Sequence, residues 1–223
     1  MTSRLSRFFA ASDQKGSLGM KFRDKRFRFF ENAFKENFEG KSPIKILDVG
    51  GTEAFWKGKK FIETGDVEII FLNLKEEPVT QPNITSMAGD ATNLSQFGDQ
   101  SIDLVFSNSV IEHLYTWQNQ VKMALEIQRV GKKHFVQTPN KFFFIEPHYA
   151  VPFFQFIPKS IRYFLLTKTK ISRLQKWESQ RAKQYIDEIR LLSHNEVQKL
   201  FPSSKIYLEK LMGMNKSFTA HNL

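Results

Sequence analysis

The stretch Ile44-Lys45-Ile46-Leu47-Asp48-Val49-Gly50-Gly51 is a short, mostly apolar run that ends in two adjacent glycines. An apolar run of this length, followed at once by turn-forming residues, is typical of a buried strand. Glycine at the end of such a strand lets the backbone turn sharply and approach a ligand closely. We therefore predict a strand over 44–49, and after it a turn that either approaches a ligand or only joins the strand tightly to a helix.

Further apolar runs follow this strand and alternate with helical periodicity. The expected strands cover 67–74, 84–87, 102–106 and 133–137, and a closing antiparallel hairpin covers 205–211 and 216–220. A helix over 110–130 is expected to bury one stripe and to end at Gly131 in the usual C-terminal position, and a second helix is expected over 183–201. The predicted stripe contains Val110, Leu114, Val121 and Leu125. Strands that alternate with helices predict an α/β fold with a mostly parallel sheet and helices on both faces.

Two segments beside this alternating pattern differ from it. Over 22–38, four phenylalanines fall at helical spacing between charges, which predicts an amphipathic helix. They are Phe27, Phe30, Phe34 and Phe38. Residues 141–176 contain three prolines and many aromatic residues without a single period. We expect a basic N-terminal helical segment over 1–41 and a sheet domain over 42–223, interrupted by an inserted aromatic cap over 141–182.

The composition excludes several classes of protein. The 223 residues include no cysteine, which rules out thiol nucleophiles, zinc–cysteine sites and iron–sulfur clusters. No apolar run approaches the roughly 18–20 residues of a membrane span, and Met1 to Ala11 lack the longer apolar stretch of a secretory signal. The absence of cysteine fits a reducing compartment, so a cytoplasmic location is expected.

The net charge of +10 is unevenly distributed along the chain. Residues 1–41 and 141–190 carry the basic excess and are rich in phenylalanine, whereas the segment between them is slightly acidic. Basic residues interleaved with aromatic ones favour nucleic acid, an anionic membrane surface or a phosphorylated substrate as partner. A solvated basic surface over ordinary apolar packing accounts for the same pattern equally well.

Small or polar residues follow the other predicted strands. Asn73 ends the second strand, Gly89-Asp90-Ala91 follows the third, and Ser107 follows the fourth. The turn after Asp48 lacks the glycine pattern of a dinucleotide site and the lysine of a phosphate-binding loop. A carboxylate at this point suits a ligand that carries positive charge.

Together, residues 44–140 resemble the class I S-adenosylmethionine-dependent methyltransferases. The resemblance rests on Asp48-Val49-Gly50-Gly51, on Gly89-Asp90-Ala91 and on the segment that runs from Ile102-Asp103-Leu104-Val105-Phe106 to Glu112-His113-Leu114. It implies a Rossmann-like fold with a seven-stranded, mostly parallel sheet and a terminal antiparallel hairpin, a methyltransferase domain over 42–223, and S-adenosylmethionine as cofactor. The family usually has glycines where this chain has Thr52 and Ala54.

The resemblance also implies residue roles. Asp48, Gly50 and Gly51 would line the amino-acid part of the cofactor. Asp90 with Ala91 would contact the adenine, and Ser107 would lie under the cofactor. Asn73 stands where the family usually has an acid for the ribose hydroxyls, and an amide can still accept one hydrogen bond and donate another.

Two histidines are candidates for the base that takes a proton from the methyl acceptor. His113 follows the fourth strand, and His148 lies at the start of the cap. Structural roles, at a helix start and in a turn, are the alternatives. Glu112, His113 and Glu146 have the residue types of a metal site, but neighbours in sequence do not share a helix face, so we expect no metal.

The loop after the fourth strand lacks the Asn/Asp-Pro-Pro-aromatic sequence of methyltransferases that act on exocyclic amines, which favours an oxygen acceptor. Residues 138–149, with the aromatic run after them, resemble methyltransferases encoded with bacterial glycan-assembly genes. This implies a hydroxyl of a sugar, glycan or other small or lipid-linked acceptor, whose phosphates would contact cap cations such as Lys159 and Arg162. The alternatives are an RNA methyltransferase and a non-catalytic protein with this fold. Peripheral contact with an anionic membrane is compatible with the enzyme.

Overall fold

The computed structural model describes residues 18–59 and 65–223, and its centre is a seven-stranded sheet in the order β3-β2-β1-β4-β5-β9-β8. The strands are β1 (Ile44–Val49), β2 (Val67–Asn73), β3 (Ile84–Ala88), β4 (Ile102–Asn108), β5 (Gly131–Pro139), β8 (Lys205–Leu211) and β9 (Met214–His221). The first five pair in parallel, and β9 lies antiparallel between β5 and β8. The predicted Rossmann-like sheet and its terminal hairpin are confirmed.

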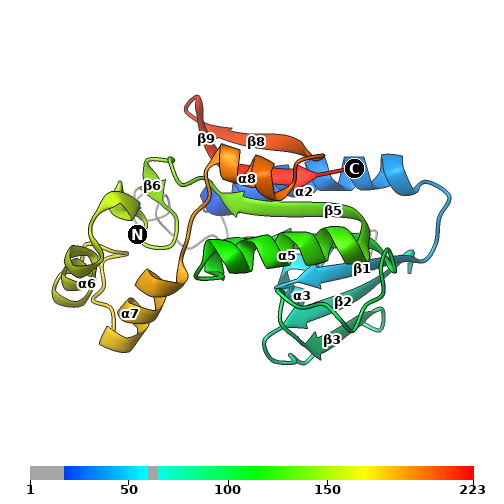
Figure 1. The fold of residues 1–223 in the computed structure, drawn as a ribbon, viewed down its shortest axis with the longest axis horizontal. Helices are drawn as coiled ribbons and strands as arrows, with labels where there is room; N and C mark the ends of the chain where they lie inside the picture. Colours follow the sequence, from blue (N-terminus) through cyan, green and yellow to red (C-terminus); the bar gives the residue numbers. More distant parts are fainter. Residues whose placement is uncertain (1–17, 60–64) are drawn as a thin grey trace.

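Helices cover both faces of the sheet (Figure 1). Successive strand residues point to opposite faces, so Ile46 joins one core cluster and Leu47 the other. The first cluster packs under α2 (Leu18–Phe38) and α3 (Glu53–Trp56), and the second under α5 (Trp117–Val130) and α8 (His194–Leu200). The result is a three-layer arrangement with the sheet in the middle.

The four phenylalanines predicted on one face of the first helix are all buried. Phe30 is fully buried, with its ring centroid 5.0 Å from that of Phe106 on β4 and 5.1 Å from that of Phe135 on β5. Burial of one such ring contributes roughly 1.5–3 kcal/mol, so this face holds α2 on the sheet.

The helix predicted over 110–130 begins later than expected. Residues Ile111–His113 form a short 3-10 turn, η1, and α5 begins after Thr116, whose hydroxyl accepts a hydrogen bond from the backbone N–H of Asn119. The predicted stripe is correct in part: Val110, Leu114 and Val121 are partly buried against the second cluster, but Leu125 is 61% exposed, because the predicted periodicity was counted from before the start of the helix. The buried residues of α5 are Gln120, Met123, Ala124, Ile127 and Val130.

Gly131 follows α5 but does not adopt the left-handed conformation that usually ends a helix. Its φ is −96° and it is the first residue of β5. A Cβ at this position would lie 2.7 Å from Cγ2 of Val105. Close packing of the helix end on β4, rather than a left-handed turn, therefore requires the glycine.

The helix predicted over 183–201 is two helices. α7 (Ser179–Glu188) ends before an extended segment that bonds to the end of β5, where the N–H of Lys141 donates to the Leu192 carbonyl over 2.9 Å. Ser193 and Glu196 then form a reciprocal capping box that starts α8. The hydrophobic pattern alone predicted one continuous helix, but the capping box at Ser193 starts a second one.

The cap projects beyond the carboxyl ends of the parallel strands (Figure 1). It contains β6 (Ile145–Glu146), β7 (Val151–Pro152), η2 (Phe154–Phe156) and α6 (Lys159–Lys168), and it packs against α7. Its separate apolar cluster consists of Tyr149, Val151, Phe154, Leu166, Trp177, Ala182 and Ile186.

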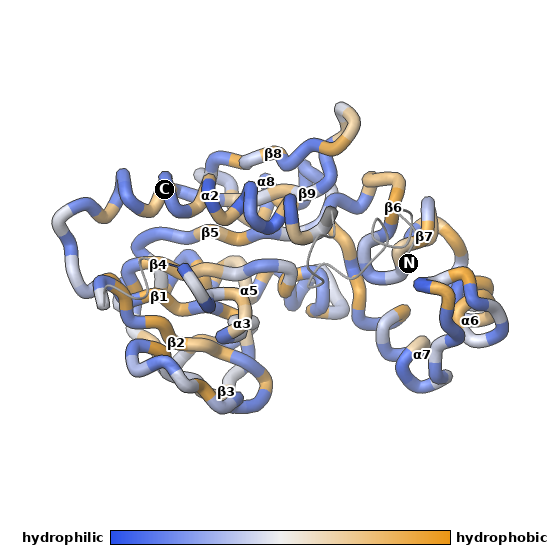
Figure 2. Tube along the Cα trace, turned by 180° about the vertical axis from the view of Figure 1, so that it is seen from behind, coloured by the Kyte–Doolittle hydropathy of each residue, from blue (hydrophilic) through white to orange (hydrophobic). Residues whose placement is uncertain are grey.

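Several other aromatic side chains of the cap face solvent, among them Phe142, Phe153 and Phe164, and Figure 2 shows apolar segments on α6 at this end. Among the described residues, no helix combines the length and the apolar character needed to cross a membrane.

Candidate cofactor and acceptor site

The turn after β1 lies where the strand order reverses, because β1 pairs with β2 on one side and with β4 on the other. Ligands of open parallel sheets bind at this place, beyond the carboxyl ends of the strands. Gly50 has a φ of +78°, and a side chain there would collide with Val110. A Cβ on Gly51 would lie 2.5 Å from a carboxylate oxygen of Asp48. Both glycines are therefore needed for the shape of this turn.

Asp48 is buried beneath the turn. Its Oδ2 accepts a hydrogen bond from the indole nitrogen of Trp56 over 2.6 Å. Burial raises the pKa of Asp48 to about 8, although the bond from Trp56 acts in the opposite direction. In this geometry Asp48 fastens α3 to β1, and its predicted contact with the cofactor stays a prediction.

Two more predicted residues meet at this turn. The Asn73 side-chain amide, at the end of β2, donates to the Gly51 carbonyl over 2.9 Å. The Ser107 hydroxyl, near the end of β4, is fully buried and donates to the Val49 carbonyl over 3.1 Å. Side chains of the two neighbouring strands therefore support the backbone of the turn.

Asp90 and Ala91 lie at the adjacent carboxyl end, after β3. Asp90 is exposed, and its Oδ1 accepts bonds of 2.8 Å from the backbone N–H and the hydroxyl of Thr92. The Gly89 N–H donates to the Asn73 carbonyl over 2.8 Å, which ties this loop to the end of β2. The predicted cofactor residues thus follow one edge of the sheet, from β3 to β4.

His113 and His148, here called the histidine pair, face each other across the junction between η1 and the cap. Their Nε2 atoms are 3.2 Å apart. Nδ1 of His113 lies 2.5 Å from a carboxylate oxygen of Glu188 on α7, and Nδ1 of His148 lies 2.7 Å from one of Glu146. Sequence reasoning missed Glu188, because it lies far along the chain in a helix with no other mark of function.

Burial and the neighbouring carboxylate act against each other on His148. Burial lowers its pKa, but the charge of Glu146 and its hydrogen bond outweigh this and raise the pKa overall. Glu146 is itself buried, and its second oxygen accepts the N–H of Tyr149 over 2.8 Å. The His148 ring is therefore held in a fixed orientation.

Glu112 also reaches the histidine pair, contrary to the expectation that it points away from His113. Residues 111–113 form a 3-10 turn instead of an α-helix, so the α-helical face argument does not apply. One ligand atom from each of Glu112, His113 and His148 lies within 4.8 Å of the other two. Glu112 is fully buried; its Oε2 accepts the hydroxyl of Thr138 over 3.0 Å, and its Oε1 has no hydrogen-bond partner in the described part of the chain.

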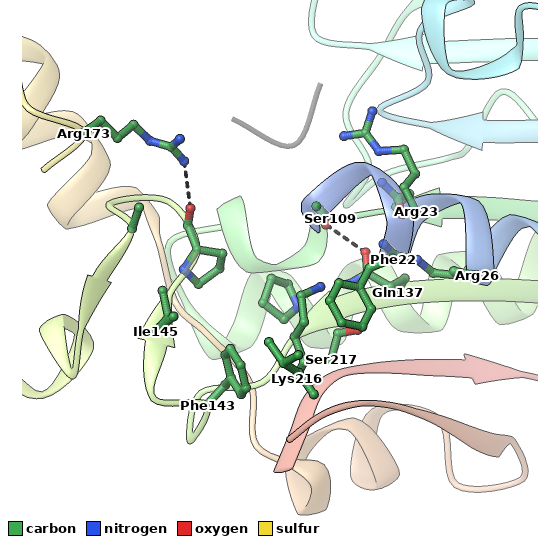
Figure 3. A pocket seen from close by; sticks show the side chains of 16 residues that line it. Phe22, Arg23, Arg26, Ser109, Gln137, Phe143, Ile145, Arg173, Lys216 and Ser217 are labelled. Carbon is green, nitrogen blue, oxygen red and sulfur yellow. Dashed lines mark hydrogen bonds between the residues drawn. The ribbon is translucent and has the colours of Figure 1, made fainter. Parts of the chain in front are cut away.

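A cavity of about 200 Å³, here called the basic cavity, opens beside the ends of β4 and β5 (Figure 3). Its walls come from the first turns of α2, the strand ends, the cap and the β8–β9 hairpin, and the lining residues include Phe22, Arg23, Arg26, Ser109, Phe143, Arg173 and Lys216. The predicted cap cations Lys159 and Arg162 are not among the lining residues, and Lys159 pairs with Asp187 at 2.7 Å.

A net positive charge is buried at one wall of the basic cavity. Glu209 of β8 bonds to Lys216 at 2.7 Å and lies 3.8 Å from Nε of Arg26. Arg26 is 8% exposed, and its Nε and Nη1 lack hydrogen-bond partners within the described ranges. Burial is the main cause that lowers its pKa, and the charge of Glu209 opposes it. Two cations therefore share one carboxylate.

Sequence reasoning missed Arg26, although a signal was present. Arg26 stands between Phe22 and Phe30 at helical spacing, on the face that was expected to be buried. A charged residue on a buried face is rare without a partner or a ligand. The pattern could have marked Arg26 as a candidate site residue.

The basic cavity adjoins the predicted cofactor edge. Ser109 lies two residues after Ser107, has a φ of +60°, and donates from its hydroxyl to the side-chain carbonyl of Gln137 over 2.8 Å (Figure 3). Both Ser109 and Gln137 line the cavity. An acceptor in this cavity would therefore lie next to the carboxyl end of β4.

Comparison with known proteins agrees with the fold. Residues 62–134 match a family model described as a methyltransferase domain. A search of curated proteins found no significant match.

Three solved structures share the fold at low identity. An O-methyltransferase by description, from Nostoc punctiforme, has 13% identity and a TM-score of 0.50 over 87% of this chain. A sarcosine dimethylglycine methyltransferase by description, from Galdieria sulphuraria, has 16% identity and a TM-score of 0.50 over 86% of this chain. A Bordetella parapertussis protein described as exported has 10% identity and a TM-score of 0.54 over 88% of this chain. The chain spans 55%, 63% and 67% of the lengths of these three structures.

Proposed function

We propose that this chain is a class I S-adenosylmethionine-dependent methyltransferase, and that it transfers the methyl group to a hydroxyl of a sugar or glycan that carries phosphate, as in a nucleotide-linked or lipid-linked acceptor. The observation that carries the proposal is the basic cavity beside β4, with its buried surplus of positive charge. The proposed reaction is cytoplasmic, and the basic, aromatic cap would contact an anionic membrane surface when the acceptor is lipid-linked.

The residues at the sheet edge fit the cofactor in chemical type. Gly50 and Gly51 form a turn without side chains, in which a Cβ would meet neighbouring atoms. With Asp48 they would hold the amino-acid part, while Asn73 would bind the ribose and Ser107 would support the turn from below. Asp90, which is exposed, would accept a hydrogen bond from the adenine amino group, and Ala91 would lie beside it. When bound, the cofactor supplies an electrophilic methyl group on a positively charged sulfur.

The basic cavity offers complementary groups to a phosphorylated sugar. Arg23, Arg26 and Lys216 would bind phosphate, because hydrogen bonds to charged groups are the stronger ones. Phe22 and Phe143 would pack against the sugar ring or an isoprenoid chain. The acceptor hydroxyl must lose its proton as its oxygen takes the methyl group, and we propose that the histidine pair assists this loss.

The test compares matched acceptors with and without phosphate. Methyl transfer from S-adenosylmethionine is measured with a nucleotide-linked sugar, a prenyl-phosphate-linked sugar and the same sugar unphosphorylated. Arg23→Gln is expected to raise KM for the phosphorylated acceptors about tenfold or more, because one charge-assisted hydrogen bond is worth roughly 1.5–3 kcal/mol. KM for the unphosphorylated sugar and the Kd of the cofactor should stay unchanged.

Arg28→Gln is the matched control, since Arg28 is exposed on the same helix and does not line the cavity. Equal use of phosphorylated and unphosphorylated sugars by the wild type would contradict the proposal. Methylation of RNA, with a steep loss of affinity as salt rises, would favour a nucleic-acid acceptor instead.

A further inference from the structure

We propose that His113, His148 and Glu112 bind a divalent transition-metal ion, for which Zn²⁺ is the natural probe. The inference goes beyond the proposed function, because it makes the two histidines ligands of an ion in place of free bases, and it departs from the expectation of a metal-free protein. It starts from the arrangement of the two imidazole rings, whose Nε2 atoms face each other at 3.2 Å while each Nδ1 lies against a carboxylate.

The carboxylates determine which nitrogen of each ring carries the proton. A neutral imidazole has one donor nitrogen and one acceptor nitrogen. Glu188 and Glu146 are acceptors when ionised, so each Nδ1 donates, and both Nε2 atoms present lone pairs to each other. Two lone pairs that face each other at this distance repel, so either a proton or a metal ion lies between them.

The spacing fits a metal ion. Two nitrogens bound to Zn²⁺ at about 2.0–2.1 Å in tetrahedral geometry are about 3.3 Å apart. The observed separation of the two Nε2 atoms is 3.2 Å. The histidine pair therefore already has the separation of two ligands on one ion.

Glu112 supplies the third ligand. Its carboxylate is fully buried, and its Oε1 has no hydrogen-bond partner among the residues that the structure describes. A buried carboxylate oxygen without a partner is costly, which is an independent sign that something binds there. Its ligand atom lies within 4.8 Å of both histidine nitrogens, so it has to move inward by at most about 1.5 Å to reach the spacing of zinc ligands.

The groups behind the ligands have the arrangement that metal sites use. A histidine ligand commonly donates its other nitrogen to a carboxylate, which fixes the ring and strengthens its binding to the metal. Here Glu188 does this for His113, and Glu146 does it for His148. Two histidines and one carboxylate with an open position suit Zn²⁺, Fe²⁺ or Mn²⁺ better than Mg²⁺. The ion would connect η1 with the cap and, through Glu188, with α7.

Calorimetry on the full chain, after treatment with a chelator, tests the inference without any acceptor. We expect one Zn²⁺ per chain with a Kd of micromolar or tighter, weaker binding of Mn²⁺, and weaker still of Mg²⁺. His148→Gln and Glu112→Gln should each weaken Zn²⁺ binding at least tenfold. Glu188→Gln, which removes no ligand, should weaken it roughly 10–100-fold.

His194→Gln is the matched control, because His194 is exposed and far from the pair in the sequence, and it should bind like the wild type. A circular dichroism spectrum checks that each variant is folded. A folded wild type that binds no Zn²⁺, or His148→Gln and Glu112→Gln variants that bind it as the wild type does, would overturn the inference. A proton shared between the two Nε2 atoms would then be the cation. Because this readout needs no methyl transfer, it is independent of the proposed function.

Discussion

A single buried carboxyl group, Asp48, connects the turn after β1 with the aromatic core. Burial raises its pKa to about 8, while the unfolded chain keeps the ordinary value near 3.8. Between about pH 4 and pH 8, the Asp48 carboxyl group is therefore protonated in the folded protein and ionised in the unfolded chain. Stability falls as pH rises through this window, with a limiting slope of about 1.4 kcal/mol per pH unit for one proton.

Asp48→Asn isolates this effect, because asparagine does not titrate and can still accept the hydrogen bond from Trp56. The free energy of unfolding in urea is measured for both proteins at pH 5, 6, 7 and 8. The stability of the wild type relative to the variant should be greatest at pH 5 and should decrease steadily toward pH 8. Other titrating groups cancel in this difference. A constant difference across the window would show that Asp48 is ionised in the folded protein.

Single residues also show how much of the candidate site could be predicted from the sequence. Pattern alone identified Gly50 and Gly51, because small residues after an apolar run indicate a turn at a strand end. It also identified His113 and His148 as candidates, but it did not predict that their side chains lie close together. Their proximity depends on the 3-10 turn η1 and on Glu188 of α7, and neither feature produces a periodic pattern in the sequence.

At the scale of elements, α2 and the β8–β9 hairpin are joined by a buried ionic network. Glu209 holds Lys216 of the hairpin and lies near Arg26 of α2, and it is itself 1% exposed. Glu209→Gln would leave the buried Arg26 and the half-buried Lys216 without their carboxylate. Removal of one partner of a buried pair typically costs about 3–5 kcal/mol.

Urea unfolding measures this cost. The control is Glu31→Gln, which removes the helical pair with the exposed Lys35 and should cost less than about 1 kcal/mol. Losses of similar size in the two variants would mean that solvent screens the Glu209 network as it screens the surface pair.

The strands were predicted more accurately than the helix limits, and the difference has a physical reason. All seven strands of the sheet were anticipated, since short apolar runs between turn signals are strong local patterns. Helix limits were less accurate where capping decides them. Thr116 delays the start of α5, and Ser193 with Glu196 starts a separate α8, so side-chain hydrogen bonds overrode a continuous hydrophobic pattern. The basic cavity could not be predicted, because five distant segments form it.

At the scale of the whole molecule, the cap has a core of its own. Phe154 is fully buried there, with its ring centroid 4.9 Å from that of Tyr149, within a cluster distinct from the two that flank the sheet. Phe154→Ala should destabilise the cap by about 3–5 kcal/mol. Because the cap cluster is separate from the two clusters that flank the sheet, we expect a local opening instead of global unfolding.

Hydrogen exchange distinguishes these outcomes. Amides over 145–189 should lose protection in Phe154→Ala, while β1 and β4 keep theirs. Phe142→Ala is the control, since Phe142 is 63% exposed and its removal should leave exchange unchanged. Equal loss of protection in the cap and the sheet would show that the two form one cooperative unit.

The packing of α2 against the last hairpin has a consequence for folding. Phe29 of α2 stacks on Tyr207 of β8 with ring centroids 4.1 Å apart, and its ring also meets that of His221 on β9. These contacts join opposite ends of the described chain, so a long loop must close before they form, and such closure slows folding. During synthesis, α2 is made long before the β8–β9 hairpin, so Phe29 lacks these two partners while the intervening residues are made. Until the hairpin is made, this part of α2 stays uncovered in the nascent chain, and chaperones bind exposed apolar surface of this kind.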